Sequence, residues 1–241
     1  MRFLNREMKD PSHLFYSSIA ADNLDINGVN KEGEVYTWSL KEIKSELNED
    51  FEWFSDYYSL SNDEIWEGNR YILYRQTSDS VFAKKYNWSN QYLKETRLKV
   101  NDKLYLFRQN KPSPVVDKKF IFSWNALAVR GFIDAYKSFD DEFFLEQAGK
   151  TLNALLSDNF YKKKRILHIK NTSETLLLLE DYAVLIDALI SFYEVTADER
   201  KLTLAKELTD FVLDTFTSEN GVYFKFAEDK KTSIAGSMIQ Y

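Results

Sequence analysis

The sequence predicts a mainly α-helical fold, an (α/α) toroid in which helical hairpins stand around a central hollow. Three observations favour it: the chain repeats itself at a spacing of 57 residues, each repeat holds an apolar and an amphipathic helix, and longer excursions join the repeats. The helix pairs are too few to close a ring. We therefore expect a single domain over residues 1–241, an incomplete toroid with short β-hairpin-like excursions.

The repeat is visible when residues 124–148 are laid over residues 181–205 without a gap. Seven of the 25 aligned positions are identical, which is well above chance. A fixed self-similar period is typical of folds built from stacked supersecondary units. Tetratricopeptide-type solenoids fit less well, because their period is about 34 residues and both of their helices are amphipathic.

Each repeat is predicted to form an inner and an outer helix. The first segment, at 124–137 and again at 181–195, is apolar nearly all the way round, which predicts burial on every side. The second segment, at 141–156 and 198–215, carries an apolar stripe with charged residues elsewhere. We expect the second helix of each pair to cover the outside of the first.

Capping residues mark where several helices begin. Asp141 and Asp198 stand directly before the outer helices, where their side-chain oxygens can accept from first-turn amides. Ser39 with Glu42 forms an S-x-x-E capping box, which predicts a helix starting at Leu40.

The other elements follow from alternating aromatic and apolar patterns and from turn residues. Pro112 and Pro114 end the long amphipathic helix before them, because proline cannot continue a helix. In chain order we predict a helix tail at 1–11, an extended segment at 13–21, a polar loop at 22–33, a strand at 34–38, helices at 40–47, 51–60, 79–86 and 90–109, loops at 62–68 and 112–119, a strand at 221–226 and a loop at 228–236.

Composition excludes several classes of protein. A hydrophobic share of 44% and an aromatic share of 16% predict a substantial core and exclude disorder. The net charge of -6, with acidic and basic residues interleaved, argues against a nucleic-acid binder, which would show a basic face. The basic run 162–165 is predicted to be the solvated C-terminal end of an outer helix.

Residue counts also bear on metals and membranes. The chain has no cysteine, hence no disulfide and no thiolate ligand, and its two histidines argue against a histidine-rich metal centre. No apolar run is long enough to cross a bilayer, and no signal-peptide pattern opens the chain. We expect a soluble cytoplasmic protein that uses no metal and no cofactor.

Four stretches resemble a known family, the thioredoxin-domain-containing proteins typified by spermatogenesis-associated protein 20. Long strings carry the resemblance in the family's order: FYSSIAAD with KEGEVYTWSLKEI, then EGN, then LFRQNKPSPVVDKKFIFSWNALAV, then LEDYAVLIDALISFYEVT. The resemblance implies a thioredoxin-like domain, absent from this chain, followed by a toroid similar to N-acylglucosamine 2-epimerase and the six-hairpin glycosidases.

The chain departs from the family's pattern at two points. The family's paired acids before the first inner helix become Val116 and Asp117, which weakens a two-carboxylate site there. The family's glycine after the Trp-Asn pair becomes Ala126, while the acidic pair Glu180 and Asp181 is kept.

The candidate site lies where the inner helices begin. In a toroid these N-terminal ends face one mouth of the hollow, where unpaired amides and aligned dipoles favour polar ligands. The candidates are Asp117, Lys118, Trp124 and Asn125 in the first repeat, and Glu180, Asp181 and Tyr182 in the second.

Each candidate has an alternative role. Trp124 and Tyr182 could stack on a sugar ring or simply fill the core, and Asn125 could bond a ligand or the neighbouring loop. Asp181 is the best candidate for a general acid or base, because desolvation among aromatic residues favours its neutral form. Its alternative is a helix cap or a salt bridge with Lys118.

Two further pairs of residues are considered. Asp22 and Glu32 flank the early loop, and two carboxylates on opposite sides of a cleft would suit glycoside hydrolysis; the alternative is that both are solvated. His13 and His168 could form a proton-transfer pair, although neither falls on an inner helix, and structural roles are favoured.

The resulting hypothesis is a carbohydrate-processing or sugar-binding toroid of epimerase or glycosidase type, with Asp181 or Asp22 as the catalytic acid. The alternative is a non-catalytic binding or interaction module of a larger thioredoxin-domain-containing protein. The expected partner is a small sugar-like molecule, with neither nucleic acid nor membrane. Because an open ring would leave apolar helix flanks uncovered, we also expect a homodimer.

Overall fold

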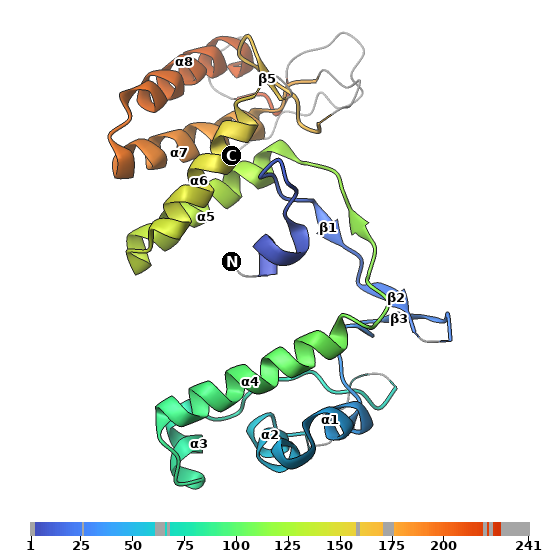
Figure 1. Cartoon of the computed structure of the whole chain (residues 1–241). Coiled ribbons are helices and arrows are strands. Elements are labelled where there is room, and N and C mark those ends of the chain that lie inside the picture. Colours follow the sequence, from blue (N-terminus) through green and yellow to red (C-terminus); the bar gives the residue numbers. More distant parts are fainter. Residues whose placement is uncertain are drawn as a thin grey trace. The chain divides into compact units, whose positions relative to one another are not determined.

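The computed structural model describes residues 3–25, 27–60, 66, 68–157, 160–170, 176–218, 221 and 224–227. The chain divides into two compact units, each described here by itself: unit 1 is Met1–Ser18 with Val116–Tyr241, and unit 2 is Ile19–Val115 (Figure 1). It leaves unit 1 through β1 (Ser18–Ile19) and returns through β4 (Val116–Asp117). The single domain over residues 1–241 stays a prediction.

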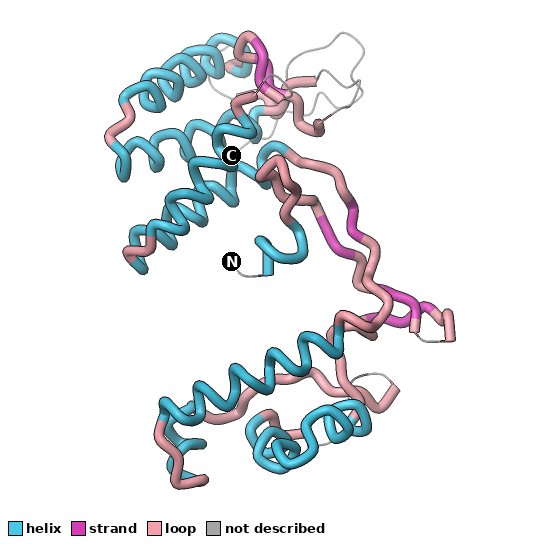
Figure 2. The backbone as a smooth tube through the Cα atoms, viewed as in Figure 1, coloured by secondary structure: helices cyan, strands magenta, loops and turns pink. Residues whose placement is uncertain are grey.

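The chain is mainly α-helical with short β-hairpins, as the sequence predicts (Figure 2). Unit 1 holds two helical hairpins, α5 (Phe122–Phe139) with α6 (Glu142–Leu155), and α7 (Leu179–Thr196) with α8 (Glu199–Phe216). The starts of both helices are shifted by the predicted 57 residues from one hairpin to the next. The inner helix α5 packs against α6 and α7, and α7 packs against α8, which confirms the inner and outer layers.

The two hairpins turn in the same way. Asp140 and Ala197 end the inner helices in the left-handed conformation, with φ of 51° and 54°. The next residue, Asp141 or Asp198, is extended and caps the outer helix, accepting from the amide of Phe143 at 3.0 Å or Arg200 at 3.2 Å. Both predicted caps are confirmed.

The two inner helices lie parallel and in register. Arg130 pairs with Asp187 at 2.9 Å, and Lys137 pairs with Glu194 at 2.7 Å, so equivalent positions of the two repeats face one another along the contact. The starts of α5 and α7 therefore lie at the same end of unit 1, as a toroid requires.

The core of unit 1 lies between these helices and includes the N-terminal segment. Phe15 packs against Phe132 of α5 with ring centroids 5.7 Å apart. The predicted burial of the inner helices on every side is wrong, because helical neighbours cover only part of each. One stripe stays exposed on each inner helix, with Trp124, Leu127 and Asp134 on α5, and Glu180, Asp187 and Glu194 on α7.

The excursions return to the inner-helix starts. The hairpin of β5 (Tyr161–Lys162) and β6 (Arg165–Ile166) follows α6, and Ile169 then pairs with Ile121 directly before α5. The basic run 162–165 is thus a hairpin turn with positive φ at Lys163 and Lys164, and the predicted helix end is wrong.

Unit 2 combines a β-hairpin with helices. The hairpin is β2 (Asp22–Leu24) with β3 (Asn30–Glu32), and the helices are α1 (Leu40–Leu47), a 3-10 turn (Asn48–Asp50), α2 (Phe51–Tyr57), α3 (Asp79–Lys85) and α4 (Asn90–Arg108). They enclose a second core that is rich in aromatic side chains. The capping box of Ser39 and Glu42 is confirmed, with both of its hydrogen bonds present.

Several predicted elements need correction. Residues 34–38 form a turn instead of a strand, because Gly33 takes a φ of 68° and its carbonyl accepts from the amides of Tyr36 and Thr37. The polar loop 22–33 is the β2–β3 hairpin, and the helix tail at the N-terminus is one π-helical turn, Leu4–Met8. Among the described residues of 221–226, only an isolated bridge at Phe224 occurs. The loops 62–68 and 228–236 lie mostly or wholly outside the described residues.

Candidate functional site

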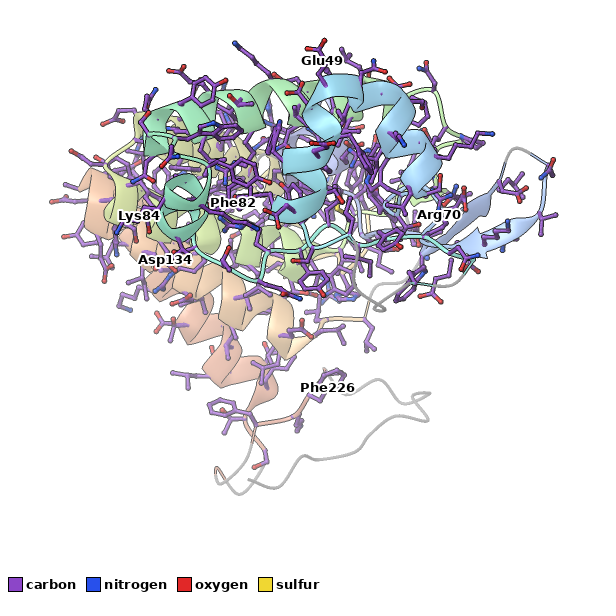
Figure 3. The ribbon with its side chains drawn as sticks, turned by 90° about the horizontal axis from the view of Figure 1, so that it is seen from below. Glu49, Arg70, Phe82, Lys84, Asp134 and Phe226 are labelled. Atoms are coloured by element: carbon purple, nitrogen blue, oxygen red, sulfur yellow. The ribbon has the colours of Figure 1, made fainter. Side chains whose placement is uncertain are left out.

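A polar cavity of about 470 Å³ opens in unit 2. It lies between the β2–β3 hairpin, the turn that follows β3, the start of α1 and the chain around Arg70, which Figure 3 labels near the hairpin. Charged and polar side chains dominate the lining, which consists of Asp25, Asn27, Lys31, Glu32, Glu34, Ser39, Glu42, Gly68 and Arg70.

Local hydrogen bonds shape this cavity. The carboxylate of Asp25 accepts from the amides of Asn27 at 2.8 Å and Val29 at 2.9 Å, which closes the hairpin loop. The buried side chain of Asn23 accepts from the amide of Val35 at 3.2 Å and so holds the next turn against the hairpin. The chain then enters α1 at its cap, Ser39.

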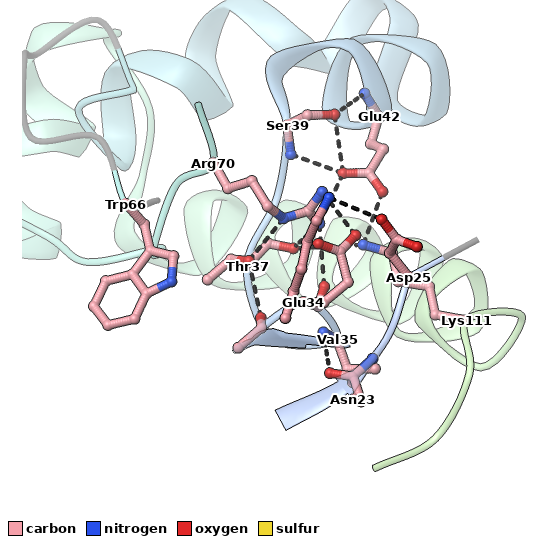
Figure 4. A network of polar contacts seen from close by, with 12 residues as sticks. Asn23, Asp25, Glu34, Val35, Thr37, Ser39, Glu42, Trp66, Arg70 and Lys111 are labelled. Atoms are coloured by element: carbon pink, nitrogen blue, oxygen red, sulfur yellow. Dashed lines mark hydrogen bonds and ion pairs between the residues drawn. The ribbon is translucent and has the colours of Figure 1, made fainter. Parts of the chain in front are cut away.

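Arg70 is the centre of the charged network (Figure 4). One terminal nitrogen pairs with Glu34 Oε1 at 3.0 Å, and the other pairs with Glu42 Oε2 at 3.2 Å. The guanidinium also donates from Nε to Thr37 Oγ1 at 2.8 Å and from its second terminal nitrogen to Thr37 O at 2.6 Å. Its side chain is only 13% exposed, so these partners hold it in one orientation.

Lys111 supports the network from behind Glu42. Its ammonium lies 2.8 Å from Glu42 Oε1 and over the ring of Trp38, 4.7 Å from the centroid, and its side chain is 9% exposed. Burial favours the neutral form of Glu42, but the hydrogen bonds from Lys111 and Ser39 outweigh it, so the pKa of Glu42 lies below its ordinary value.

Asp25 is also held in its charged form. Its carboxylate lies 2.8 Å from Lys31, and this hydrogen bond, together with the amide of Val29, lowers the pKa of Asp25 to about 2. The acidic groups of the network are therefore ionised at neutral pH. They can accept hydrogen bonds from a ligand, while Lys31 and Arg70 lie beside them as donors.

The predicted rim acids lie at this hairpin. Glu32 lines the cavity, and Asp22 is its direct cross-strand partner. Their placement on opposite sides of a cleft is therefore wrong, because directly paired residues of an antiparallel hairpin are immediate neighbours on one face. Asp22 accepts from the side chain of Asn30 at 3.2 Å.

In unit 1 the start of α7 holds a buried acid. Asp181 is fully buried and accepts from the amide of Ser123 in the first turn of α5, at 3.2 Å. Nδ1 of His168 lies 3.0 and 3.1 Å from its two oxygens. Burial raises the pKa of Asp181 above its ordinary value. The predicted salt bridge with Lys118 is thus replaced by His168, and the predicted cap is on the neighbouring helix.

Two predicted ligand-binding residues are structural. Tyr182 is fully buried, and its hydroxyl donates to Lys164 O at 2.8 Å and accepts from the amide of Ile166 at 3.3 Å. Asn125 is buried and bonds both the amide and the carbonyl of Phe15. Neither side chain presents a surface to a ligand: Tyr182 anchors the β5–β6 hairpin, and Asn125 anchors the N-terminal segment.

The other predicted residues of unit 1 are more open. Trp124 is 51% exposed on the first turn of α5. Asp117 accepts from the amide of Lys119 at 3.1 Å and pairs with its ammonium at 2.9 Å, and Lys118 lies between them in the approach to α5. His13 takes a φ of 68° in the N-terminal segment, and its carbonyl accepts from Thr151 at 2.9 Å.

Sequence reasoning missed the core of the cavity. It identified Glu42 only as a cap, and it assigned no role to Arg70 or Lys111. No local signal marks them, because Arg70 meets Thr37 across 33 residues of chain and Lys111 meets it across 74.

Two searches of the described ranges found nothing. None of the helices there is long and apolar enough to span a membrane. Nor does that part of the chain hold a cluster of three or more His, Asp or Glu side chains arranged to hold a metal ion.

No family model matches the chain. It is 27% identical to an uncharacterized protein of Caenorhabditis elegans over 91% of its length, and 25% identical to spermatogenesis-associated protein 20 of Rattus norvegicus over 93%. These alignments cover 34% and 32% of the relatives, so the chain spans about a third of their length. The expected similarity to proteins of that name is confirmed.

Solved structures with related folds include sugar-active enzymes. A cellobiose 2-epimerase from Bacillus thermoamylovorans matches 93% of this chain and 55% of its own, with a TM-score of 0.44 and 11% identity. A sugar epimerase from a ruminal bacterium matches 79% and 40%, with a TM-score of 0.43 and 16% identity. A GH76 α-mannanase from Bacteroides thetaiotaomicron matches 50% and 34%, with a TM-score of 0.42 and 21% identity.

Proposed function

We propose that this chain binds a small, neutral carbohydrate in the cavity of unit 2. The observation that carries the proposal is a cavity of about 470 Å³ in which fixed acceptors and donors lie side by side. Pockets for small molecules typically measure about 300–1,000 Å³. This volume suits a ligand of the size of a monosaccharide or a disaccharide.

The chemistry of the lining favours hydroxyl groups. A sugar hydroxyl donates one hydrogen bond and accepts others, so it matches a carboxylate that lies next to a cationic donor. Asp25 beside Lys31 and Glu34 beside Arg70 are two such pairs. Asn27 and Ser39 add neutral polar groups to the lining.

The charge balance favours a ligand without net charge. Asp25, Glu34 and Glu42 are matched by Lys31, Arg70 and Lys111, and Glu32 adds one further carboxylate. An anionic ligand would meet repulsion from the acids, and a cation would have to compete with three fixed positive groups. A polyhydroxyl molecule needs neither kind of compensation.

The same network favours binding over hydrolysis at this cavity. A glycosidase needs one carboxylic acid with a raised pKa to protonate the leaving group. In this network the pKa values of Asp25 and Glu42 are lowered by their cationic partners. The cavity therefore supports the second hypothesis, a sugar-binding module, which in a thioredoxin-domain-containing protein would select the molecules brought to that domain.

Thermal unfolding and calorimetry with a panel of neutral mono- and disaccharides test the proposal. A sugar at 100 times its dissociation constant should stabilise the chain by about 2.7 kcal/mol. Glu32→Gln should weaken binding about tenfold, while Asp22→Asn, a change of its cross-strand partner outside the cavity lining, should not. The proposal is wrong if no neutral sugar raises the melting temperature, or if both variants weaken binding equally.

A further inference from the structure

Unit 1 contains an ionisable pair that the sugar-binding cavity does not use. Asp181, at the start of α7, is completely buried, so its carboxylate cannot touch a ligand. Its described contacts are the amide of Ser123 and the imidazole of His168. Any chemistry of this carboxylate must therefore reach the surface through His168.

The hydrogen bond fixes the orientation of His168. A carboxylate accepts hydrogen bonds, so Nδ1, at 3.0 and 3.1 Å from the two oxygens, carries the proton. In the neutral ring Nε2 then has a free lone pair, the form required of a base. The side chain is 29% exposed, and because its Nδ1 edge faces buried Asp181, the exposed edge is the one that carries Nε2.

The backbone of His168 is held as firmly as its ring. Its carbonyl accepts from the amide of Phe122, the first residue of α5, at 2.8 Å, and the next residue, Ile169, pairs with Ile121. The main chain is thus bound to α5 while the ring is bound to α7. Preorganised positioning of this kind is what acid–base catalysis requires of a side chain.

A cation and an aromatic ring lie on the same side of this two-stranded segment. Lys170 is two residues from His168, which places both side chains on one face, about 7 Å apart along an extended chain. Its ammonium lies over the ring of Phe120, 5.1 Å from the centroid, and Phe120 stacks on Tyr16 at 5.3 Å. A positive charge therefore lies beside the imidazole.

We propose that His168 is an acid–base residue, positioned by Asp181, that acts on a hydroxy-ketone or a similar carbonyl compound. Nε2 removes a proton from the carbon next to the carbonyl, and the electron pair moves onto the carbonyl oxygen to give an enolate. The Lys170 ammonium stabilises that oxyanion. Return of the proton from Nε2 to carbon restores the ketone and the neutral imidazole. This site is independent of the sugar-binding cavity.

The tautomer is tested by nitrogen-15 NMR of the two imidazoles in the full chain. His13→Asn assigns the signals, because asparagine tolerates the positive φ at that position. The neutral His168 ring should carry its proton on Nδ1, and Asp181→Asn should shift that balance. A neutral His168 protonated on Nε2 would overturn the positioning role of Asp181.

Proton transfer is tested with dihydroxyacetone in heavy water, following deuterium incorporation by proton NMR. The chain should accelerate exchange over buffer, His168→Gln should lower the rate about 100-fold, and His13→Asn should leave it unchanged. Circular dichroism of each variant shows whether it is folded. Failure of the folded chain to exceed the buffer rate, or an undiminished rate in His168→Gln, overturns the proposal.

Discussion

Trp124 and Asp181 occupy equivalent positions on the inner helices α5 and α7, yet Trp124 is half exposed and Asp181 is completely buried. Asp181 extends toward α5, where it meets Ser123. By the repeat, Trp124 extends to the corresponding side of its own helix, away from α7. The two side chains therefore do not face each other, and their placement does not support a pocket shared by both.

Arg70→Met should destabilise the chain by about 2–4 kcal/mol, because Glu34 and Glu42 would lose the partner that compensates their desolvation. Urea unfolding measures the change. Arg70→Lys should fall in between, since it keeps the charge and loses the planar fork. Lys85→Met, which breaks the exposed pair with Asp56 in the same unit, should cost less than about 1 kcal/mol. Equal losses for Arg70→Met and Lys85→Met would contradict a special role for Arg70.

Asp25 should make stability depend on pH in the acid range. Its folded pKa of about 2 lies below the ordinary value of 3.8, so its contribution is present above about pH 4 and is lost as the pH falls toward 2. The difference in unfolding free energy between the wild type and Asp25→Asn should shrink over that window. A gap that stays constant from pH 6 to pH 2 would show that the Lys31 pair does not shift this pKa.

Ser123→Ala should stabilise unit 1 by about 1 kcal/mol. The Ser123 hydroxyl is buried and has no hydrogen-bond partner in the described structure, and such a group costs about 1–3 kcal/mol. The backbone amide that Asp181 accepts from is unaffected by the change. Chemical denaturation measures the shift, and a loss of stability would mean that the hydroxyl has a partner after all.

The two outer-helix caps should contribute alike. Asp141→Ala and Asp198→Ala each remove a hydrogen bond to a first-turn amide, and each should cost about 1 kcal/mol. Thermal unfolding of the two variants compares them directly. An effect confined to one variant would show that the two turns, alike in backbone, differ in energy.

The expected homodimer can be tested at the exposed stripe of α5. Trp124 and Leu127 are each about half exposed there, and apolar side chains grouped on a helix face favour association. Light scattering should show a dimer for the wild type and a shift toward monomer for Leu127→Lys. A monomeric wild type at high concentration would remove this prediction.

The sequence by itself determined what depends on neighbours within a few residues. The caps at Ser39, Asp141 and Asp198 lie where they were predicted, because a cap bonds an amide two or three residues away. The inner and outer helices follow from apolar periodicity, and the repeat follows from identities 57 residues apart. Each of these features can be read along the chain without knowing what packs against it.

Only the tertiary structure decided which of those residues have access to a ligand. Tyr182 and Trp124 are both aromatic residues at the start of an inner helix, but packing buries the first and leaves the second open. The cavity depends on Arg70 and Lys111, whose partners lie far away in the sequence. Burial and long-range pairing arise from the way distant segments fold together, and a linear pattern holds no record of that geometry.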